Sequence, residues 1–262
     1  DSDTNANSAT FVSWNWKAGG AGSANTDGDI ASTVSVNSTA GFSIVKYTGT
    51  GSVATIGHGL GAVPKMIIIK NTSSSSPAFV WRVYNAGLTI AGANSLQLQS
   101  SAAAEAGYWN NTTPTTTVFS VGANGETNQS SGTNIAYCFA DVTGYSKFST
   151  YVGNGNTDGT FIYTGFKPAF IMVKQSTGTS QWIIQDVKRS PINVAQTVLY
   201  PDDSGAEGVN AWANIDILSN GFKMRTSNAY YNGSGGTYIY MAFASNPFVA
   251  TSGTNAVPVT AR

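Results

Sequence analysis

Charged residues are scarce in this chain of 262 residues. Thirteen Lys and Arg balance thirteen Asp and Glu, and all four types make up only 10% of the residues, against roughly a quarter in a typical domain. A chain without net charge has no field that would draw it to nucleic acid or to an anionic membrane, so neither partner is expected. Ser, Thr, Asn and Gly fill the polar positions instead, which favours strands and turns over helices.

Cysteine is limited to Cys138, so the chain has no internal disulfide framework. This residue lies in an alternating run, Ile135 to Phe139, where we expect a buried and unreactive thiol. No apolar stretch approaches the ~20 residues of a membrane-spanning helix, and no signal peptide is visible. The chain starts at Asp1 without an initiator Met, from which we expect a fragment or a processed product.

Residues for catalysis are also few. The only histidine, His58, sits in a glycine-rich turn without an accompanying nucleophile motif. Paired carboxylates would be needed to cleave a glycan, but Glu105 and Glu207 follow Ala-rich loops at matching places, which indicates a structural role, and Asp202 and Asp203 are adjacent in sequence. We therefore predict no catalytic residue, no cofactor and no enzymatic activity.

A metal site is expected nowhere. The string Asn154 to Gly159 resembles the start of a calcium loop, but the distal Glu is missing and Asn-rich turns produce such a string freely. No spacing typical of a zinc site occurs. We interpret this string as a turn.

Internal repetition is the most informative feature present. Segments that match lie 104 residues apart: Pro64 to Lys70 with Pro168 to Lys174, Tyr47 to Gly51 with Tyr151 to Gly155, and Asn128 to Ala140 with Asn232 to Ala244. Within each unit, short alternating runs are separated by Gly, Asn and Ser turns. The run after Pro64 is continuously apolar, which predicts a strand buried on both faces.

A partial third copy opens the chain. Thr10 to Trp16 resembles the strands expected at Thr133 to Phe139 and at Thr237 to Phe243. We interpret it as the closing strand of a preceding unit that the chain lacks. Such a strand would expose its apolar face and unpaired backbone, so Phe11, Trp14 and Trp16 are predicted to pair with another domain or a neighbouring chain.

The predicted fold is all-β: two tandem β-sandwich modules of jelly-roll or lectin-like type, preceded by an N-terminal strand from the partial repeat. The expected boundaries are residues 1–40 for that strand and a Gly/Ser/Asn linker, 41–144 and 145–248 for the modules, and 249–262 for a tail.

Sugar binding is the functional prediction that the residues favour most. Saccharides dock on exposed aromatic rings flanked by amide and carboxylate groups, on loops held by a rigid scaffold. The candidate residues fall in three loop clusters: Tyr108, Trp109 and Asn110; Trp212; and Tyr230 with Tyr231. The alternative is that these rings pack under long loops or against a partner subunit.

Several strings resemble repeats in bacteriophage virion proteins of the tail-fibre, tail-spike and head-fibre-like kind. They are Trp14 to Gly20, Asn25 to Gly28, Ala40 to Val45, His58 to Ile67, and Gly221 to Lys223. The resemblance covers nearly the whole chain and implies a virion surface appendage with lectin-like β-sandwich modules. It supplies no ligand or binding residues. In the second unit, Tyr163 to Phe166 stands where the first unit has His58 to Leu60, so the two units would not share a role for His58.

Together these observations predict a phage virion protein of a tail fibre or surface appendage that attaches to host-surface glycans through several weak sites. Its expected partners are other copies of itself, with a trimer favoured, other virion proteins and a host glycan. One alternative is a capsid-decorating or purely structural assembly protein without a receptor. A polysaccharide-degrading tail spike is the third, disfavoured by the shortage of acids.

Overall fold

The computed structural model describes residues 6–73, 79–88, 92 and 94–244, and these form an almost entirely β structure, which confirms the predicted all-β class. The strands are β1 (Ser23–Asn25), β2 (Ser32–Asn37), β3 (Phe42–Thr48), β4 (Ala54–Gly57), β5 (Met66–Asn71), β6 (Arg82–Asn85), β7 (Asn94–Gln97), β8 (Glu105–Ala106), β9 (Val118–Val121), β10 (Thr133–Phe139), β11 (Ser146–Val152), β12 (Phe161–Tyr163), β13 (Pro168–Gln175), β14 (Ile183–Asp186), β15 (Thr197–Val198), β16 (Gly208–Val209), β17 (Ile215–Leu218), β18 (Gly221–Met224) and β19 (Thr237–Ala244). The helices are single turns: α2 (Gly125–Asn128), α3 (Ala229–Asn232) and the 3₁₀ turn η1 (Ala211–Ala213).

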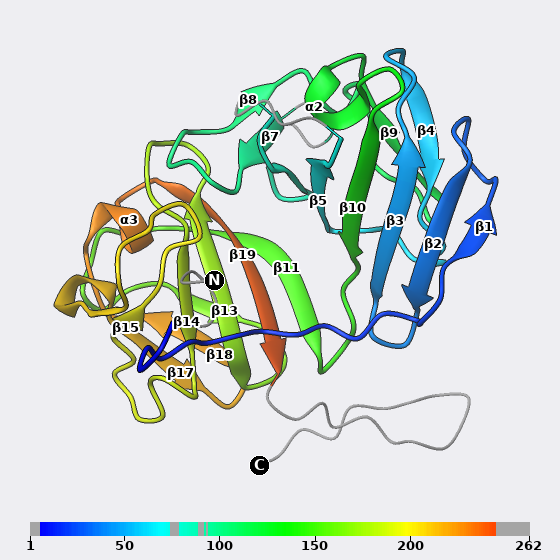
Figure 1. Ribbon diagram of the computed structural model, residues 1–262. Helices are drawn as coiled ribbons and strands as arrows, with labels where there is room; N and C mark the ends of the chain where they lie inside the picture. Colours follow the sequence, from blue (N-terminus) through cyan, green and yellow to red (C-terminus); the bar gives the residue numbers. More distant parts are fainter. Residues whose placement is uncertain (1–5, 74–78, 89–91, 93, 245–262) are drawn as a thin grey trace.

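The strands up to β10 form the first half of the molecule and those from β11 onward the second (Figure 1). In the first half an eight-stranded antiparallel sheet has the order β1-β2-β3-β10-β5-β6-β7-β8, and β4 pairs with β9. In the second half one sheet has the order β11-β19-β13-β14, a smaller one the order β12-β18-β17, and β15 pairs with β16.

Elements recur at the spacing found in the sequence. The first residues of β11 and β19 lie 104 residues after those of β3 and β10. The hydroxyl of Tyr47 donates to the carbonyl oxygen of Thr127 at 2.5 Å. The hydroxyl of Tyr151 donates to the backbone carbonyl oxygen of Tyr231 at 2.7 Å. Each bond ties a strand to a one-turn helix of the same half, β3 to α2 and β11 to α3.

Each half has a core of its own. In the first half, side chains from the inner face of the large sheet pack against β4 and β9, with Tyr84, Trp109 and Phe119 among the largest buried groups. In the second half, the β11-β19-β13-β14 sheet packs in the same manner on β17 and β18, around Phe222 and Tyr238. Each half therefore has two layers of strands over one apolar interior.

A third core joins the halves. It gathers side chains from the opposite faces of the two large sheets, including Met66, Ile68 and Phe139 of the first half and Phe148 and Phe243 of the second. The rings of Phe139 and Phe148 lie 5.6 Å apart. Strand β5 therefore contributes to two cores, which confirms the prediction that it is buried on both faces.

Two loops reinforce this junction with hydrogen bonds. The indole Nε1 of Trp182 donates to the carbonyl oxygen of Gln97 at 2.7 Å. The backbone N–H of Ser180 donates to the carbonyl oxygen of Ser101 at 2.9 Å. The ammonium group of Lys174 also donates to Ser101, at 3.2 Å. Apolar burial together with these directional bonds holds the two halves in one arrangement.

The segment predicted to be a linker is partly structured, and that prediction was wrong. Within residues 17–40, β1 and β2 extend the large sheet beyond β3. Val34 of β2 is buried in the first core, because Thr33 to Val36 alternates polar and branched apolar residues as a half-buried strand does.

The N-terminal segment also differs from its prediction. No strand forms over Thr10 to Trp16, and β1 is the first strand among the described residues. Figure 1 shows this segment, in dark blue, crossing in front of β13 and β19 on its way to β1. The ring of Trp16 lies against Phe139, Phe170 and Phe243, at 6.1, 5.7 and 5.4 Å. Aromatic packing, not a backbone ladder, fixes the segment across both halves.

Candidate functional site

Trp109, one of the predicted sugar-contacting rings, is a core residue. Its side chain is 1% exposed and its ring stands edge-on to Tyr84 at 5.6 Å. A ring whose faces are covered by protein cannot stack on a saccharide. Trp109 therefore packs inside the protein, as the alternative prediction for these rings had it.

The ring face of Tyr108 is covered by the guanidinium group of a buried arginine. The guanidinium carbon of Arg82 lies 3.5 Å from the centre of the Tyr108 ring, and Arg82 Nη2 donates to the tyrosine hydroxyl at 2.5 Å. Arg82 is itself buried and ion-paired with Glu105 and Glu126. The next predicted residue, Asn110, is exposed with a left-handed backbone (φ 52°), so this cluster offers only an amide at the surface.

The second half retains an accessible pair of rings. Tyr230 on α3 is 42% exposed, and Trp212 in η1 is partly buried. Their rings stand edge-to-face, 5.5 Å apart at 75°. Tyr231 is buried beneath Trp212, 6.1 Å from its ring, and its hydroxyl donates to Gln185 at 2.7 Å. Of the six predicted residues, Trp212 and Tyr230 are thus brought together at the surface, with Tyr231 as their support.

Polar groups lie beside this ring pair. Asn210, just before η1, donates from Nδ2 to the hydroxyl of Tyr200 at 3.3 Å. Burial first, and the nearby carboxylates of Asp203 and Asp202 next, raise the pKa of Tyr200, so its hydroxyl stays protonated as a donor. An exposed ring beside a part-buried one, with a hydroxyl and an amide nearby, is a set of groups that can contact a sugar.

His58 is fully buried, and both of its ring nitrogens have protein partners. The backbone N–H of Leu60 donates to Nδ1, and Nε2 lies 3.2 Å from the carbonyl oxygen of Thr115. Since a carbonyl only accepts, Nε2 carries the proton and the ring is the neutral tautomer. Burial lowers the pKa of His58 and favours this form.

Two of the carboxylates that we considered for glycan cleavage, Glu105 and Glu207, are tied to arginines, whereas Asp202 accepts from the backbone of Trp182 and Asp203 from Gln181. Glu105 binds Arg82, and Glu207 accepts from Arg189 at 3.0 Å. Burial alone raises the pKa of Glu105, but hydrogen bonds from Arg82 and Gln97 outweigh it, so the pKa lies below its usual value. An acid held in its ionised form is a poor proton donor.

The Asn154 loop is held by bonds within the protein. Asn154 Oδ1 accepts from the backbone of Asn156 and from Asn232 Nδ2, and Asn156 Oδ1 accepts from the backbone of Asp158. The carboxylate of Asp158 pairs with Lys223 and Arg225. These are the bonds of successive Asx turns. Across the described ranges, no three His, Cys, Asp or Glu side chains gather as metal ligands would.

A cavity of about 400 Å³ lies between the halves beneath the N-terminal segment. Trp14 and Trp16 form one wall, and the stacked pair of Trp81 and Tyr137 (6.3 Å, 22°) lies on another. None of the residues lining it is charged. It can receive an apolar group but has no means of acid–base chemistry.

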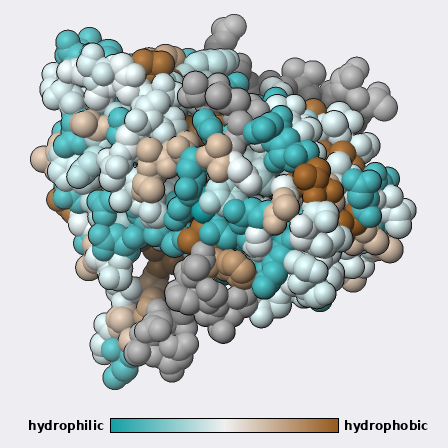
Figure 2. Space-filling view, turned by 90° about the horizontal axis from the view of Figure 1, so that it is seen from above, coloured by the Kyte–Doolittle hydropathy of each residue, from teal (hydrophilic) through white to brown (hydrophobic). Residues whose placement is uncertain are grey.

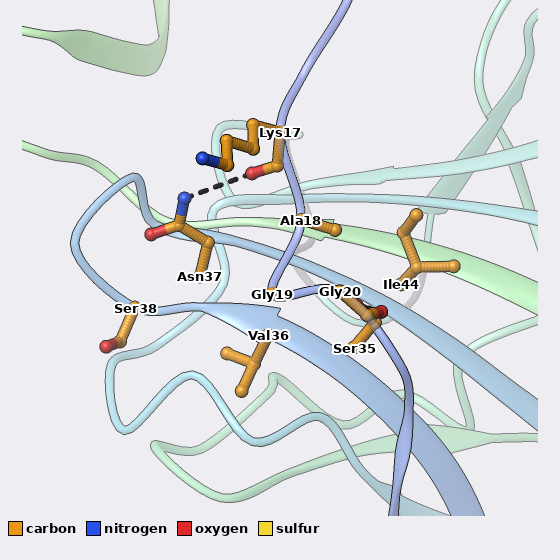
Figure 3. A pocket seen from close by; sticks show the side chains of 9 residues that line it. All are labelled: Lys17, Ala18, Gly19, Gly20, Ser35, Val36, Asn37, Ser38 and Ile44. Atoms are coloured by element: carbon orange, nitrogen blue, oxygen red, sulfur yellow. Dashed lines mark hydrogen bonds between the residues drawn. The ribbon is translucent and has the colours of Figure 1, made fainter.

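A shallower groove of about 740 Å³ lies where the segment crosses β2 (Figure 3). Asn37 Nδ2 donates to the carbonyl oxygen of Lys17, and the Ser35 hydroxyl donates to that of Gly20. Gly19 is required because a Cβ there would lie 2.0 Å from the carbonyl oxygen of Val36. The polar groups of this groove serve to hold the segment on the sheet.

A family comparison places these features in a wider group. The model of the family described as Domain of unknown function (DUF7483) matches residues 1–247. The chain belongs to this family. No curated protein and no solved structure matches it. The DUF7483 match spans the N-terminal segment as well as both halves, in keeping with the shared third core. No helix in the described part of the chain is long and apolar enough to cross a membrane.

Phe161 and Tyr163 of β12 are surface aromatics that the sequence analysis missed. They are 43% and 60% exposed, while Ile162 between them is buried. The alternation Phe-Ile-Tyr was the available signal, because neighbouring strand residues face opposite ways. Val152, at the end of β11, is also exposed.

Proposed function

We propose that this DUF7483 protein is a structural and attachment unit of a phage virion appendage, located on the virion surface. It consists of two tandem β-sandwich modules of lectin-like type. The proposal starts from the resemblance of its sequence strings to virion fibre and spike proteins. The observation that carries it is the third core, since sheets packed face to face make a stiff unit that transmits load between its ends.

In this proposal, Trp212 and Tyr230 contact a glycan on the host surface. The pair is accessible, braced from below by Tyr231, and bordered by Tyr200 and Asn210. One such site binds weakly, and several copies on a particle add their affinities by effective concentration. Self-association, with a trimer favoured, supplies those copies, and other virion proteins anchor the appendage.

Binding of the purified protein to a glycan array and to host cells tests this role. Trp212→Ala and Tyr230→Ala are expected to reduce binding at least tenfold, and Tyr230→Phe to keep most of it because the ring remains. Ile192→Ser is the matched control, since Ile192 is a 78% exposed side chain of the same half. Equal binding by Trp212→Ala and the control would refute the glycan contact.

A second candidate function has support of its own. Trp109, Tyr108 and Tyr231 lie in cores or under loops, and this favours a purely structural or capsid-decorating protein without a receptor. The two candidates differ in the same experiment: a structural protein assembles into particles but binds no host cell. Loss of polymer size on incubation with host polysaccharide would instead indicate a degrading enzyme.

A further inference from the structure

The open edge of β12 differs from its counterpart in the first half. Ile162 of β12 pairs with Phe222, as Ile56 of β4 pairs with Phe119. Strand β12 is thus the counterpart of β4, and Tyr163 takes the place of Gly57. The two edges can therefore be compared residue by residue.

In the first half this edge is covered by the chain itself. The backbone N–H of Ile30 donates to the carbonyl oxygen of Thr55 at 3.0 Å, and Asp29 accepts from the backbone of Thr55 at 2.9 Å. The hydroxyl of Ser32 donates to the carbonyl oxygen of Gly57. The chain from Asp29 to Ser32 thus satisfies the outward backbone groups of β4.

In the second half the corresponding groups of β12 are uncovered. The bonds from Met224 N–H to Thr160 and from Thr164 N–H to Asn220 set the ladder with β18. Because hydrogen-bonded pairs alternate in antiparallel strands, Phe161 and Tyr163 turn their backbone groups away from β18. Among the described residues, no hydrogen bond reaches these groups. Strand β12 is therefore an edge with two exposed aromatic side chains.

The same chain contains an exposed segment without a backbone partner. Residues Thr10 to Ser13 are exposed, Phe11 by 53% and Val12 by 39%. In the described structure they form no strand and no backbone hydrogen bond. They carry no charge, so pairing them with a sheet edge desolvates no ionic group. An open edge and an unpaired apolar strand segment complement each other.

We propose that Thr10 to Ser13 of one copy of this chain add as a strand to the β12 edge of a second copy. Val12 then faces the same way as Ile162 and extends the apolar layer, while Phe11 lies beside Phe161 and Tyr163. Lys223 lies opposite Phe161 on β18, and its charge is paired with Asp158, which also pairs with Arg225. The contact is heterologous, so it closes into a ring if the rotation permits. This is independent of glycan contact by Trp212 and Tyr230.

Mass measurement in solution by light scattering over a concentration series tests the pairing. The edge variant Phe161→Lys/Tyr163→Lys and the segment variant Phe11→Lys/Val12→Lys are each expected to be monomeric. All four positions are exposed, so circular dichroism should show an unchanged fold. The control, Ile192→Lys, places a charge on another exposed apolar residue and should leave the oligomer intact.

Mixing the two variants gives the decisive result. The edge variant has an intact segment and the segment variant an intact edge, so an equimolar mixture is expected to form a heterodimer and nothing larger. A wild-type protein that stays monomeric at its highest soluble concentration would overturn the proposal. So would a segment variant that still self-associates, because β12 would then pair with itself.

Discussion

The ring of Trp16 meets the ring of Phe170 edge-on, 5.7 Å away at 88°. This contact joins the N-terminal segment to β13 of the second half, while the following residues are bonded to β2 of the first. The segment therefore acts as a strap over the junction. Its removal should weaken the coupling of the halves before it affects either core.

Trp16→Ala is expected to lower the free energy of unfolding by about 1–3 kcal/mol. The range lies below that for a fully buried tryptophan because Trp16 is only partly buried. Chemical denaturation measures the loss, and hydrogen exchange should rise first in β10 and β19. Ile192→Ala, at an exposed position, serves as the control and should change stability by no more than about 0.5 kcal/mol. Equal values for the two variants would contradict the strap.

Lys174 should make the free energy of unfolding depend on pH in the alkaline range. Burial lowers its pKa from 10.5 to about 8, with Asp202 acting in the opposite direction. Between those two values the unfolded chain binds more protons than the folded one, so stability rises with pH. The Lys174→Met variant lacks this slope, and its stability relative to wild type should therefore fall between pH 8 and 10. Denaturation curves over that range measure the difference, whose slope cannot exceed about 1.4 kcal/mol per pH unit.

His58 should govern an acid transition. Because burial lowers its pKa below the ordinary 6.5, the unfolded chain takes up a proton before the folded one does. The stabilising contribution is therefore complete above about pH 6.5 and is lost as the pH falls below it. His58→Asn should be less stable at pH 8 but flatter between pH 7 and 5. Parallel pH profiles for the two proteins would show that His58 is not the group responsible.

Trp109 and Trp212 should behave oppositely although they lie at similar places in the sequence. Trp109→Ala is expected to cost about 3–5 kcal/mol as a buried ring is lost, whereas Trp212→Ala should cost much less and reduce glycan binding instead. Thermal unfolding and array binding, measured on the same two preparations, separate the roles. A severe loss of stability in Trp212→Ala would place that ring with the core.

The strands were readable from the sequence where their periodicity was strong. Met66 to Ile69 and Thr133 to Phe139 form strands β5 and β10 because their branched and aromatic residues recur as buried strands require. Strand β2 was missed because its Ser and Thr resembled linker composition. Thr10 to Trp16 has the pattern of a strand but forms none within this chain. Resemblance to a strand does not supply a neighbouring strand with which to pair.

The candidate site was harder to predict because composition does not report burial. Tyr108, Trp109, Trp212 and Tyr230 all follow or precede polar loops, and only the fold shows which ring has a free face. For Tyr108 the deciding contact is that with Arg82, whose place over the ring depends on β7 pairing with β6 on one side and with β8 on the other. Contacts between distant segments are the information that local patterns lack.

The virion role is tested most directly by locating the protein on purified particles of the phage whose genome encodes it. Mass spectrometry of the particles, followed by immunogold electron microscopy, provides the measurement. A virion role predicts that the protein is present in the particles and that gold labels their projecting appendages. Its absence from purified particles would contradict a virion role.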